Sequence, residues 1–350
     1  MRGWAPTIVT LLAAGCSPVA LGSGAPGEAC LPPESSRLGF NAYHLVRAEL
    51  GTAEGDVDAA LVEATLVGAG ALRIWAFDES RPPQWHVALS EVLNDIAGAG
   101  LGVVASLSNL WSDYGGVPGY LRRSGRDPVL LRDFFVEPEL EEAWRSDVRD
   151  VVERHVDRDG IIAWELMNEP RCPGCDPAVL AEWLQRQRRF VRSLDPDTPI
   201  WDGDEGWARG DGWGMNSVGA LHVYPRREAN ASAADSIAHG RRRIALAASR
   251  AQQAGVPWVL GEVGWPYRGC DAADPDCTRT EEHIESNDAE KAVAFGALLT
   301  EAVRQRVDRV FVWRLAEPEA RDWDHMAVTP STMPRVRRAL CEAAHLLGPR

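Results

Sequence analysis

Short apolar runs alternate with longer amphipathic segments along the chain from about residue 36 onward. The amphipathic segments repeat apolar residues at helical spacing, and several end in Gly or are followed by Pro or Asp, as helix C-termini often are. The apolar runs are nearly continuous, which is typical of parallel strands covered on both faces. These runs span residues 38–45, 71–77, 101–108, 161–168, 199–206, 217–224, 257–265 and 309–316.

Eight strands that alternate with helices predict a (β/α)8 TIM barrel, an α/β fold. A doubly wound open sheet is the alternative, but it usually has fewer strands and a Gly-rich phosphate loop, which the sequence lacks. Barrels of this kind reach the length of this 350-residue chain as one unit. We therefore expect a single barrel domain over residues 37–350, with no internal repeat.

Residues 1–36 are expected to be an export signal and a short linker. Arg2 precedes an apolar stretch over residues 7–14, which is too short to span a bilayer permanently. The segment ends in LLAAGC, which resembles a bacterial lipoprotein signal and would place a lipid on Cys16. Ordinary cleavage a few residues later is the alternative. Both readings predict an exported protein, either extracellular or anchored to a membrane as a lipoprotein.

The overall charge excludes one class of partner. The net charge is −14, and 36 of the 37 basic residues are arginines. Such an acidic chain lacks the basic footprint of a nucleic-acid-binding protein. The chain has fourteen tryptophans, twice the number of phenylalanines. Tryptophan forms flat binding surfaces for sugar rings as well as parts of the core, so some of them are candidates for sugar binding. We expect a monomer without a cofactor.

Seven cysteines are present, and lipidation or signal cleavage would leave six of them in an oxidising setting. Sequence proximity favours two local pairs and leaves two cysteines to join the ends of the domain. The Cys-x-x-Cys motif could instead be half of a zinc site, but it has no second such motif and no nearby His, so we expect no metal. The expected disulfides are Cys172–Cys175, Cys270–Cys277 and Cys30–Cys341.

Polar and aromatic residues gather where the predicted strands end, which is where the active site of a (β/α)8 barrel lies. Buried charges at this density are costly unless they are paired, and one structural ion pair does not explain the whole set. Glu205 either supports the site or caps a loop. The candidates at strand ends are Arg73, Trp75, Asn168, Glu169, Glu205, His222, Tyr224, Glu262 and Trp313.

Two carboxylates that face each other among aromatic residues fit glycoside hydrolysis. The fourth and seventh strands lie on opposite sides of an eight-stranded barrel, so Glu169 and Glu262 could flank a bond across its mouth. In a retaining enzyme the two carboxyl groups are about 5–5.5 Å apart. We expect a drier setting to raise the pKa of Glu169, the acid, while Arg73 and Tyr224 keep Glu262, the nucleophile, ionised.

The segment WELMNEPRC at residues 164–172 resembles the Asn-Glu-Pro signature of clan A glycoside hydrolases, in the form found in family 5 β-mannanases. GFNAYHL, LRIWAFDE, NLWSDYGG, HVYP, WVLGEVGW and FVWRL agree with the family in the same order, between about residues 37 and 316. The resemblance implies that Glu169 is the acid/base, that Glu262 is the nucleophile and that Asn168 contacts the sugar 2-hydroxyl. It also implies orienting roles for Arg73, His222 and Tyr224, and a sugar platform at Trp313.

The activity implied by the resemblance is retaining hydrolysis of internal β-1,4-mannosidic bonds in mannan, glucomannan or galactomannan. The expected partner is therefore a β-mannan polysaccharide or a manno-oligosaccharide. Further candidates for substrate binding, with core packing as the alternative, are Trp75, Trp111, Trp207 and Trp265.

Three departures from the family pattern bear on sugar specificity and on endo-versus-exo action. Leu110 stands where the family commonly has a second asparagine, and Val263 replaces a phenylalanine. The stretch over residues 203–214 agrees with the family only in its Glu-Gly-aromatic start. Exo-β-mannosidase, cellulase or transglycosylase activity of the same clan is therefore the alternative. A non-catalytic surface carbohydrate-binding protein is a further alternative, against which the presence of both glutamates argues.

Overall fold

The computed structural model describes residues 36–80, 82–125, 130–206, 218–225, 232–266, 281–318 and 326–348, with side chains from residue 287 in the segment that begins at 281. Apart from residue 36, the expected export signal and linker lie outside these ranges. Among the helices of the described part, none is both long and apolar enough to cross a bilayer.

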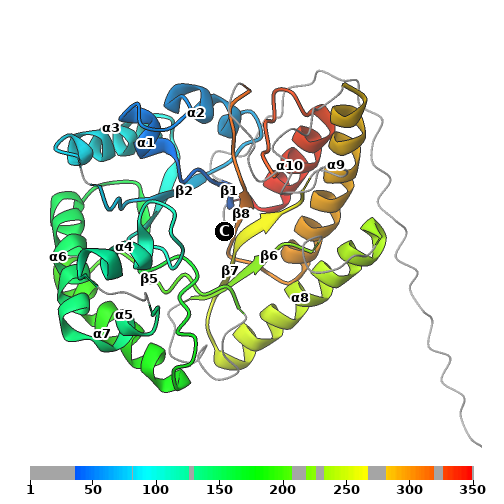
Figure 1. The fold of residues 1–350 in the computed structure, drawn as a ribbon. Helices are drawn as coiled ribbons and strands as arrows, with labels where there is room; N and C mark the ends of the chain where they lie inside the picture. The colour runs from blue at the N-terminus through cyan, green and yellow to red at the C-terminus, as the bar shows by residue number, and fades with distance from the viewer. Residues whose placement is uncertain are drawn as a thin grey trace, which may run out of the picture.

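All eight predicted strands are present and form one parallel sheet in the order β5-β4-β3-β2-β1-β8-β7-β6 (Figure 1). Every strand ends earlier than predicted, because the chain leaves the sheet to build the loops of the C-terminal face. The strands are β1 Leu38–Asn41, β2 Ala71–Trp75, β3 Gly102–Ser106, β4 Ile161–Glu165, β5 Ile200–Trp201, β6 Gly219–Val223, β7 Trp258–Gly264 and β8 Arg309–Trp313.

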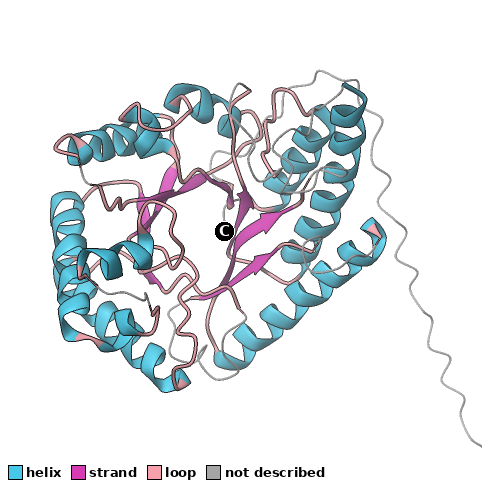
Figure 2. Ribbon diagram, in the orientation of Figure 1, coloured by secondary structure: helices cyan, strands magenta, loops and turns pink. Residues whose placement is uncertain are grey.

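The helices surround the sheet and cover its outer face (Figure 2). In α6, Leu140, Trp144, Val148 and Val151 recur at helical spacing and are buried, so this face packs on the barrel and on α7. The helices are α1 Leu45–Glu49, α2 Val57–Thr65, α3 Trp85–Gly98, α4 Gly116–Arg123, α5 Asp133–Val136, α6 Pro138–His155, α7 Pro177–Leu194, α8 Ala233–Ala254, α9 Glu281–Arg304 and α10 Pro334–Leu346.

A backbone hydrogen bond joins the two strands at the ends of this order. The N–H of His222 in β6 donates to the carbonyl of Glu205, which follows β5, at 3.2 Å. A Cβ on Gly206 would lie 3.1 Å from the carbonyl oxygen of Ala220, so the segment after β5 runs directly beside β6. This confirms the (β/α)8 barrel.

Side chains inside the barrel lie in layers. The lower layer is apolar and contains Ala71, Val104, Ala163, Trp201, Ala220, Val259 and Phe311. Because alternate residues of a strand face the same side, residues two positions further on point inward one layer nearer the C-terminal face. In this upper layer β2 contributes Arg73, β4 contributes Glu165 and β6 contributes His222. The barrel interior thus changes from apolar to charged within one layer.

A bulge in β7 brings Glu262 into the upper layer. Leu221 pairs with Leu260, but the next residue, His222, pairs with Glu262, so Gly261 is an extra residue in β7. A Cβ on Gly261 would lie only 2.7 Å from Nε2 of His222. The extra residue must therefore be glycine for His222 to lie beside Glu262.

Candidate active site

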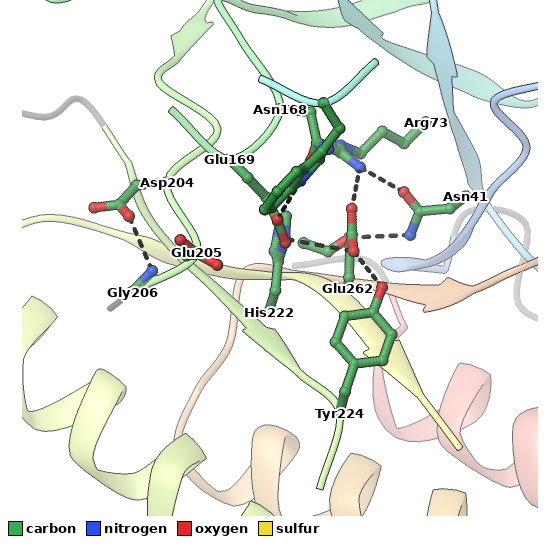
Figure 3. Close-up of polar contacts among 12 residues, drawn as sticks. Asn41, Arg73, Asn168, Glu169, Asp204, Glu205, Gly206, His222, Tyr224 and Glu262 are labelled. Atoms are coloured by element: carbon green, nitrogen blue, oxygen red, sulfur yellow. Dashed lines mark hydrogen bonds and ion pairs between the residues drawn. The ribbon is translucent and has the colours of Figure 1, made fainter. Parts of the chain in front are cut away.

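Glu169 and Glu262 lie together at the C-terminal face of the barrel, with His222 between them (Figure 3). One carboxylate oxygen of each glutamate and one ring nitrogen of His222 all lie within 4.8 Å of one another. The three residues are buried in the structure. The geometry brings together the two carboxylates that the sequence placed ninety-three residues apart.

Arg73 is completely buried, and all five of its N–H groups have acceptors. Its Nη1 donates to Glu262 Oε1 at 2.9 Å and to Asn41 Oδ1 at 2.7 Å. Its Nη2 donates to Asn168 Oδ1 at 2.7 Å. The remaining donors hold Glu165. One cation therefore orients the side chains that meet at the mouth.

Glu262 is held from several sides. Arg73 donates to one carboxylate oxygen, and the Tyr224 hydroxyl donates to the other. Nδ1 of His222 lies 3.4 Å from the second oxygen. Burial raises the pKa of Glu262, and repulsion from Glu169 adds to this increase, while His222, Arg73 and Tyr224 oppose it without cancelling it. The carboxylate is therefore fixed in place, and it is more basic than an exposed glutamate.

Glu169 is surrounded by donors. Its carboxylate lies 2.7 Å from Nδ1 of His222, accepts from Nε1 of Trp111 at 2.7 Å, and lies 3.6 Å from the guanidinium of Arg171. Burial raises the pKa of Glu169, but His222, Trp111 and Arg171 outweigh burial and lower the pKa to about 2. Its backbone has a φ of 52°, which is uncommon for a non-glycine residue and is a source of strain often found at active sites.

These pKa directions correct the expected division between the two carboxylates. We expected a raised pKa for Glu169 and a carboxylate kept ionised at Glu262, whereas Glu169 has the lowered pKa and Glu262 the raised one. Burial lowers the pKa of His222, but the charges of Glu262 and Glu169 outweigh burial and raise it. The reason for the difference is that His222, Trp111 and Arg171 surround the Glu169 carboxylate and outweigh its burial, whereas burial dominates at Glu262.

The tryptophans fall into two groups. Trp313 stacks against Tyr43 with ring centroids 5.3 Å apart at the mouth of the barrel, and Trp111 is 42% exposed beside Glu169. Trp265 is completely buried and its Nε1 donates to Glu290 of α9, so its expected role in substrate binding is wrong and core packing explains it. Trp75 is 2% exposed beneath Tyr43, so it supports the aromatic cluster and offers no face to a sugar. Trp207 lies outside the described residues.

Glu205 is buried and takes part in the site. Both its carboxylate oxygens accept from Arg171, whose guanidinium also lies 5.1 Å from the Trp111 ring and close to Glu169. Burial and the charge of Glu169 raise the pKa of Glu205, against the effect of Arg171. The positive charge of Arg171 and, beyond it, the carboxylate of Glu205 thus lie beside Glu169 on the side away from Glu262.

Two of the three departures from the family pattern lie in the core, and most of the third, residues 207–214, lies outside the described residues. Leu110 and Val263 are both buried among apolar residues between the barrel and its helices. They therefore do not line a sugar-binding surface, contrary to the expectation that they bear on sugar specificity.

Three polar residues of the site were not identified from the sequence: Asn41, Asn109 and Glu165. Asn109 Oδ1 accepts from Nδ2 of Asn168 at 2.9 Å, and Asn41 accepts from Arg73. Strand parity could have found Glu165, because it lies two residues after the inward-facing Ala163. Asn109 follows its strand by several residues, so no periodicity marks it.

The cysteines near the site are covalently paired. Cys172 and Cys175 form a disulfide in the loop that follows Glu169, with their Cα atoms 5.5 Å apart. Cys30, Cys270 and Cys277 lie outside the described residues, so the other two pairings stay predictions.

Glu169, His222 and Glu262 are also the residue types that could bind a metal ion. A cation among them would lie next to the Arg73 guanidinium and would have to displace the proton between His222 and Glu169. Positive charge is thus already supplied to both carboxylates by the protein. The arrangement suits proton transfer and nucleophilic attack.

The fold and the site define a barrel enzyme with a two-carboxylate centre of the glycoside hydrolase type. The family model described as Cellulase (glycosyl hydrolase family 5) matches residues 127–315, more than half of the chain. The chain therefore belongs to glycoside hydrolase family 5.

Similar proteins include fungal mannanases. Probable mannan endo-1,4-beta-mannosidase A-2 from Aspergillus terreus is 30% identical over 178 residues, which cover 45% of this chain and 44% of the relative. Mannan endo-1,4-beta-mannosidase A from Aspergillus aculeatus is 27% identical over 266 residues, 64% of this chain and 69% of the relative. The alignment to the first of these thus spans less than half of that relative.

A solved structure shares the fold. The endo-1,4-beta-D-mannanase from Thermotoga petrophila RKU-1 superimposes with a TM-score of 0.71 over 88% of this chain and 99% of that chain, at 21% sequence identity.

Proposed function

We propose that this protein is a retaining glycoside hydrolase that cleaves internal β-1,4-mannosidic bonds in mannan, glucomannan or galactomannan. The observation that carries the proposal is the pair Glu169 and Glu262, with carboxylate oxygens within 4.8 Å of each other across the barrel mouth. Carboxylate oxygens this close suit direct attack by the second carboxylate, as in retaining enzymes, whose carboxyl groups are about 5–5.5 Å apart. The names of the similar proteins support mannan as the substrate.

In this mechanism Glu262 is the nucleophile. Its carboxylate oxygen forms a bond to the anomeric carbon as the bond to the leaving oxygen breaks, which gives a covalent glycosyl-enzyme. Arg73 and Tyr224 hold the carboxylate in one orientation, so little reorganisation precedes attack. The raised pKa of Glu262 favours attack, because a more basic carboxylate is a better nucleophile.

Glu169 is the acid/base. It transfers a proton to the leaving oxygen in the first step and takes a proton from water in the second. His222, whose Nδ1 lies 2.7 Å from the glutamate, is the neighbouring side chain that can exchange this proton with Glu169. Glu169 and His222 thus act as one acid, with the glutamate as the group that reaches the sugar.

Other side chains position the sugar. Asn168 uses one N–H to bond Asn109, which leaves the second N–H of its amide for the sugar 2-hydroxyl. Trp313 supplies a platform beneath the sugar at the cleavage point, and Tyr43 stacks on it and fixes its plane. Trp111 lies on the side of Glu169 where the leaving group departs.

We further propose that residues 37–350 form one monomeric catalytic domain that is exported, with the first 36 residues as signal and linker. A lipid on Cys16 would keep the enzyme at a membrane. Mass spectrometry of the mature protein from its native host separates the two outcomes, because a diacylglyceryl cysteine adds a defined mass to the N-terminal peptide.

The proposed activity is tested by a time course of products from mannan, cellulose and short manno-oligosaccharides. We expect oligosaccharides of mixed length from mannan, no release from cellulose, and a first product with retained β configuration by proton NMR. Release of mannose alone would identify an exo-acting enzyme, and activity on cellulose alone would overturn the assignment to mannan. A first product of α configuration would overturn the double-displacement mechanism.

A further inference from the structure

Glu165 is a buried carboxylate that no step of the mechanism above uses. It ends β4 and is 2% exposed. Its oxygens accept from Arg73 twice, from Nη2 at 2.6 Å and from Nε at 3.0 Å. Glu262 accepts from the same guanidinium only once, from Nη1. Arg73 therefore makes more hydrogen bonds to Glu165, which takes no part in the proposed reaction, than to Glu262, the proposed nucleophile.

We propose that Glu165 is a positioning residue, which shares Arg73 with Glu262 and so sets both the direction and the nucleophilicity of the Glu262 carboxylate. The proposal rests on the proposed function of the site, in which Glu262 is the nucleophile.

The first argument is geometric. A guanidinium held at Nε and Nη2 by one carboxylate has its plane fixed, because a two-point contact leaves no rotation. The remaining N–H groups must then point at Asn41, Asn168 and Glu262. Glu165 thus fixes the direction from which Glu262 is held.

The second argument concerns charge. The fully buried Arg73 carries one positive charge, and two ionised carboxylates contact it. If Glu165 lost its charge, the whole electrostatic effect of Arg73 would fall on Glu262. The ionised form of Glu262 would then be stabilised more strongly, so its pKa would fall and its carboxylate would become less nucleophilic.

The third argument excludes a direct contact with sugar. Gly203 packs against Glu165 so closely that a Cβ on this glycine would lie 3.0 Å from the Glu165 carboxyl carbon. The side chain lies in the upper layer of the barrel interior, covered by Arg73 and by the segment after β5. Glu165 can therefore affect the reaction only through Arg73.

The test is Glu165→Gln, which keeps the shape of the side chain and removes its charge. We expect kcat on mannohexaose to fall about tenfold or more, with KM changed less than threefold. We also expect the acid limb of kcat/KM against pH to move to lower pH by about 0.5–1 unit, the size of shift that one neighbouring charge produces. A purely structural role would lower the melting temperature and leave the limb in place, which would overturn the proposal.

Two further variants keep the test decisive. Glu165→Asp retains the charge, but its side chain is too short for both contacts with Arg73, so we expect an unchanged acid limb and a lowered kcat. A kcat within twofold of the native value would contradict the geometric argument. This outcome can be read even if Glu165→Gln fails to fold. Glu63→Gln is the matched control, since Glu63 is similarly buried but, among the described residues, its carboxylate bonds to Ser331 alone, on the outside of the barrel. It should change the melting temperature alone. If the native protein cleaved no mannan, the proposed function would fail first, and separately from this inference.

Discussion

At the scale of single residues, hydrogen bonds and ion pairs link the charged side chains of the site to one another. Glu169 and Glu262 have opposite pKa shifts because His222 and Trp111 donate to the former, while burial dominates at the latter. His222 connects them through contacts of 2.7 Å and 3.4 Å. The activity should therefore depend on one proton distributed over three side chains, and the pH limits belong to the group.

Replacing Glu169 or Glu262, the proposed catalytic pair, should abolish most of the activity while the fold persists. For Glu169→Ala we expect a loss of about 10²–10⁴-fold on mannan, the usual contribution of acid–base catalysis. The loss should be smaller on an aryl β-mannoside with an acidic leaving group, because such a group needs no proton. Glu262→Ala should be inactive on both substrates. Steady-state rates, with circular dichroism as the check on folding, decide this, and near-normal turnover by either variant would refute its assignment.

Tyr224→Phe should shift the pH dependence of the reaction. The Tyr224 hydroxyl donates to the ionised Glu262 and so lowers its pKa. Without this hydrogen bond the pKa of Glu262, already raised by burial, should rise further, so ionised Glu262 is lost at a higher pH. The acid limb of kcat/KM should therefore move to higher pH, opposite to the shift expected for Glu165→Gln. An unmoved limb would show that the hydroxyl does not act on the nucleophile.

At the scale of elements, strand ends and irregularities place the chemistry. β4 carries Glu165 in its inward register and then delivers Glu169 after the strand has ended. β7 needs an extra residue to turn Glu262 inward beside His222. The loop after Glu169 is closed by the Cys172–Cys175 disulfide, which limits the positions open to Arg171. The positions of the site residues thus depend on where a strand ends, as in β4, or is interrupted by a bulge, as in β7.

The β7 bulge gives a test at this scale. In Gly261→Ala the new Cβ would lie 2.7 Å from Nε2 of His222, so the imidazole must move away from both glutamates. We expect at least a tenfold lower kcat and a loss of stability. Gly296→Ala in α9 is the matched control, because its new Cβ would meet no atom of another described element within 4 Å and alanine favours the helix by about 0.5–1 kcal/mol. Equal activity of the two variants would show that the bulge is not needed to align His222.

The sequence predicts the regular strands well, and it predicts less well the side chains whose roles depend on contacts between elements. All eight strands follow from apolar runs, and most candidate residues follow from the rule that barrel sites lie at strand ends. Trp265 was misassigned because it lies next to a strand end yet turns toward α9, a direction that no local pattern encodes. Asn109 was missed because its role depends on a contact with Asn168 from the neighbouring strand.

At the scale of the whole molecule, burial of one histidine links stability to pH. His155, at the end of α6, is 3% exposed, and neither ring nitrogen has a hydrogen-bond partner among the described residues. Burial, together with Arg158, His86 and Arg154, lowers its pKa from 6.5 to about 4. The folded protein therefore holds this imidazole neutral where the unfolded chain protonates it.

The consequence is a loss of stability in mild acid. As the pH falls from about 6.5 to about 4, the unfolded state gains a proton on His155 that the folded state does not, so the free energy of unfolding decreases over this window. His155→Phe should remove this part of the pH dependence. Urea unfolding of both proteins from pH 4 to pH 7 measures it, and parallel curves would show that His155 does not contribute.

The sequence by itself determined the alternation of strands and helices, the barrel, and the two glutamates, because periodicity and strand-end position are local properties of a chain. The tertiary structure alone decided which groups share a proton and which share Arg73. Those relations join β2, β4, β6 and β7 across the barrel, and pKa shifts depend on burial and on neighbours distant in sequence. For the same reason the sequence shows Glu165 only as one carboxylate in an apolar run. Only the folded barrel shows that it contacts Arg73, the arginine that also holds Glu262.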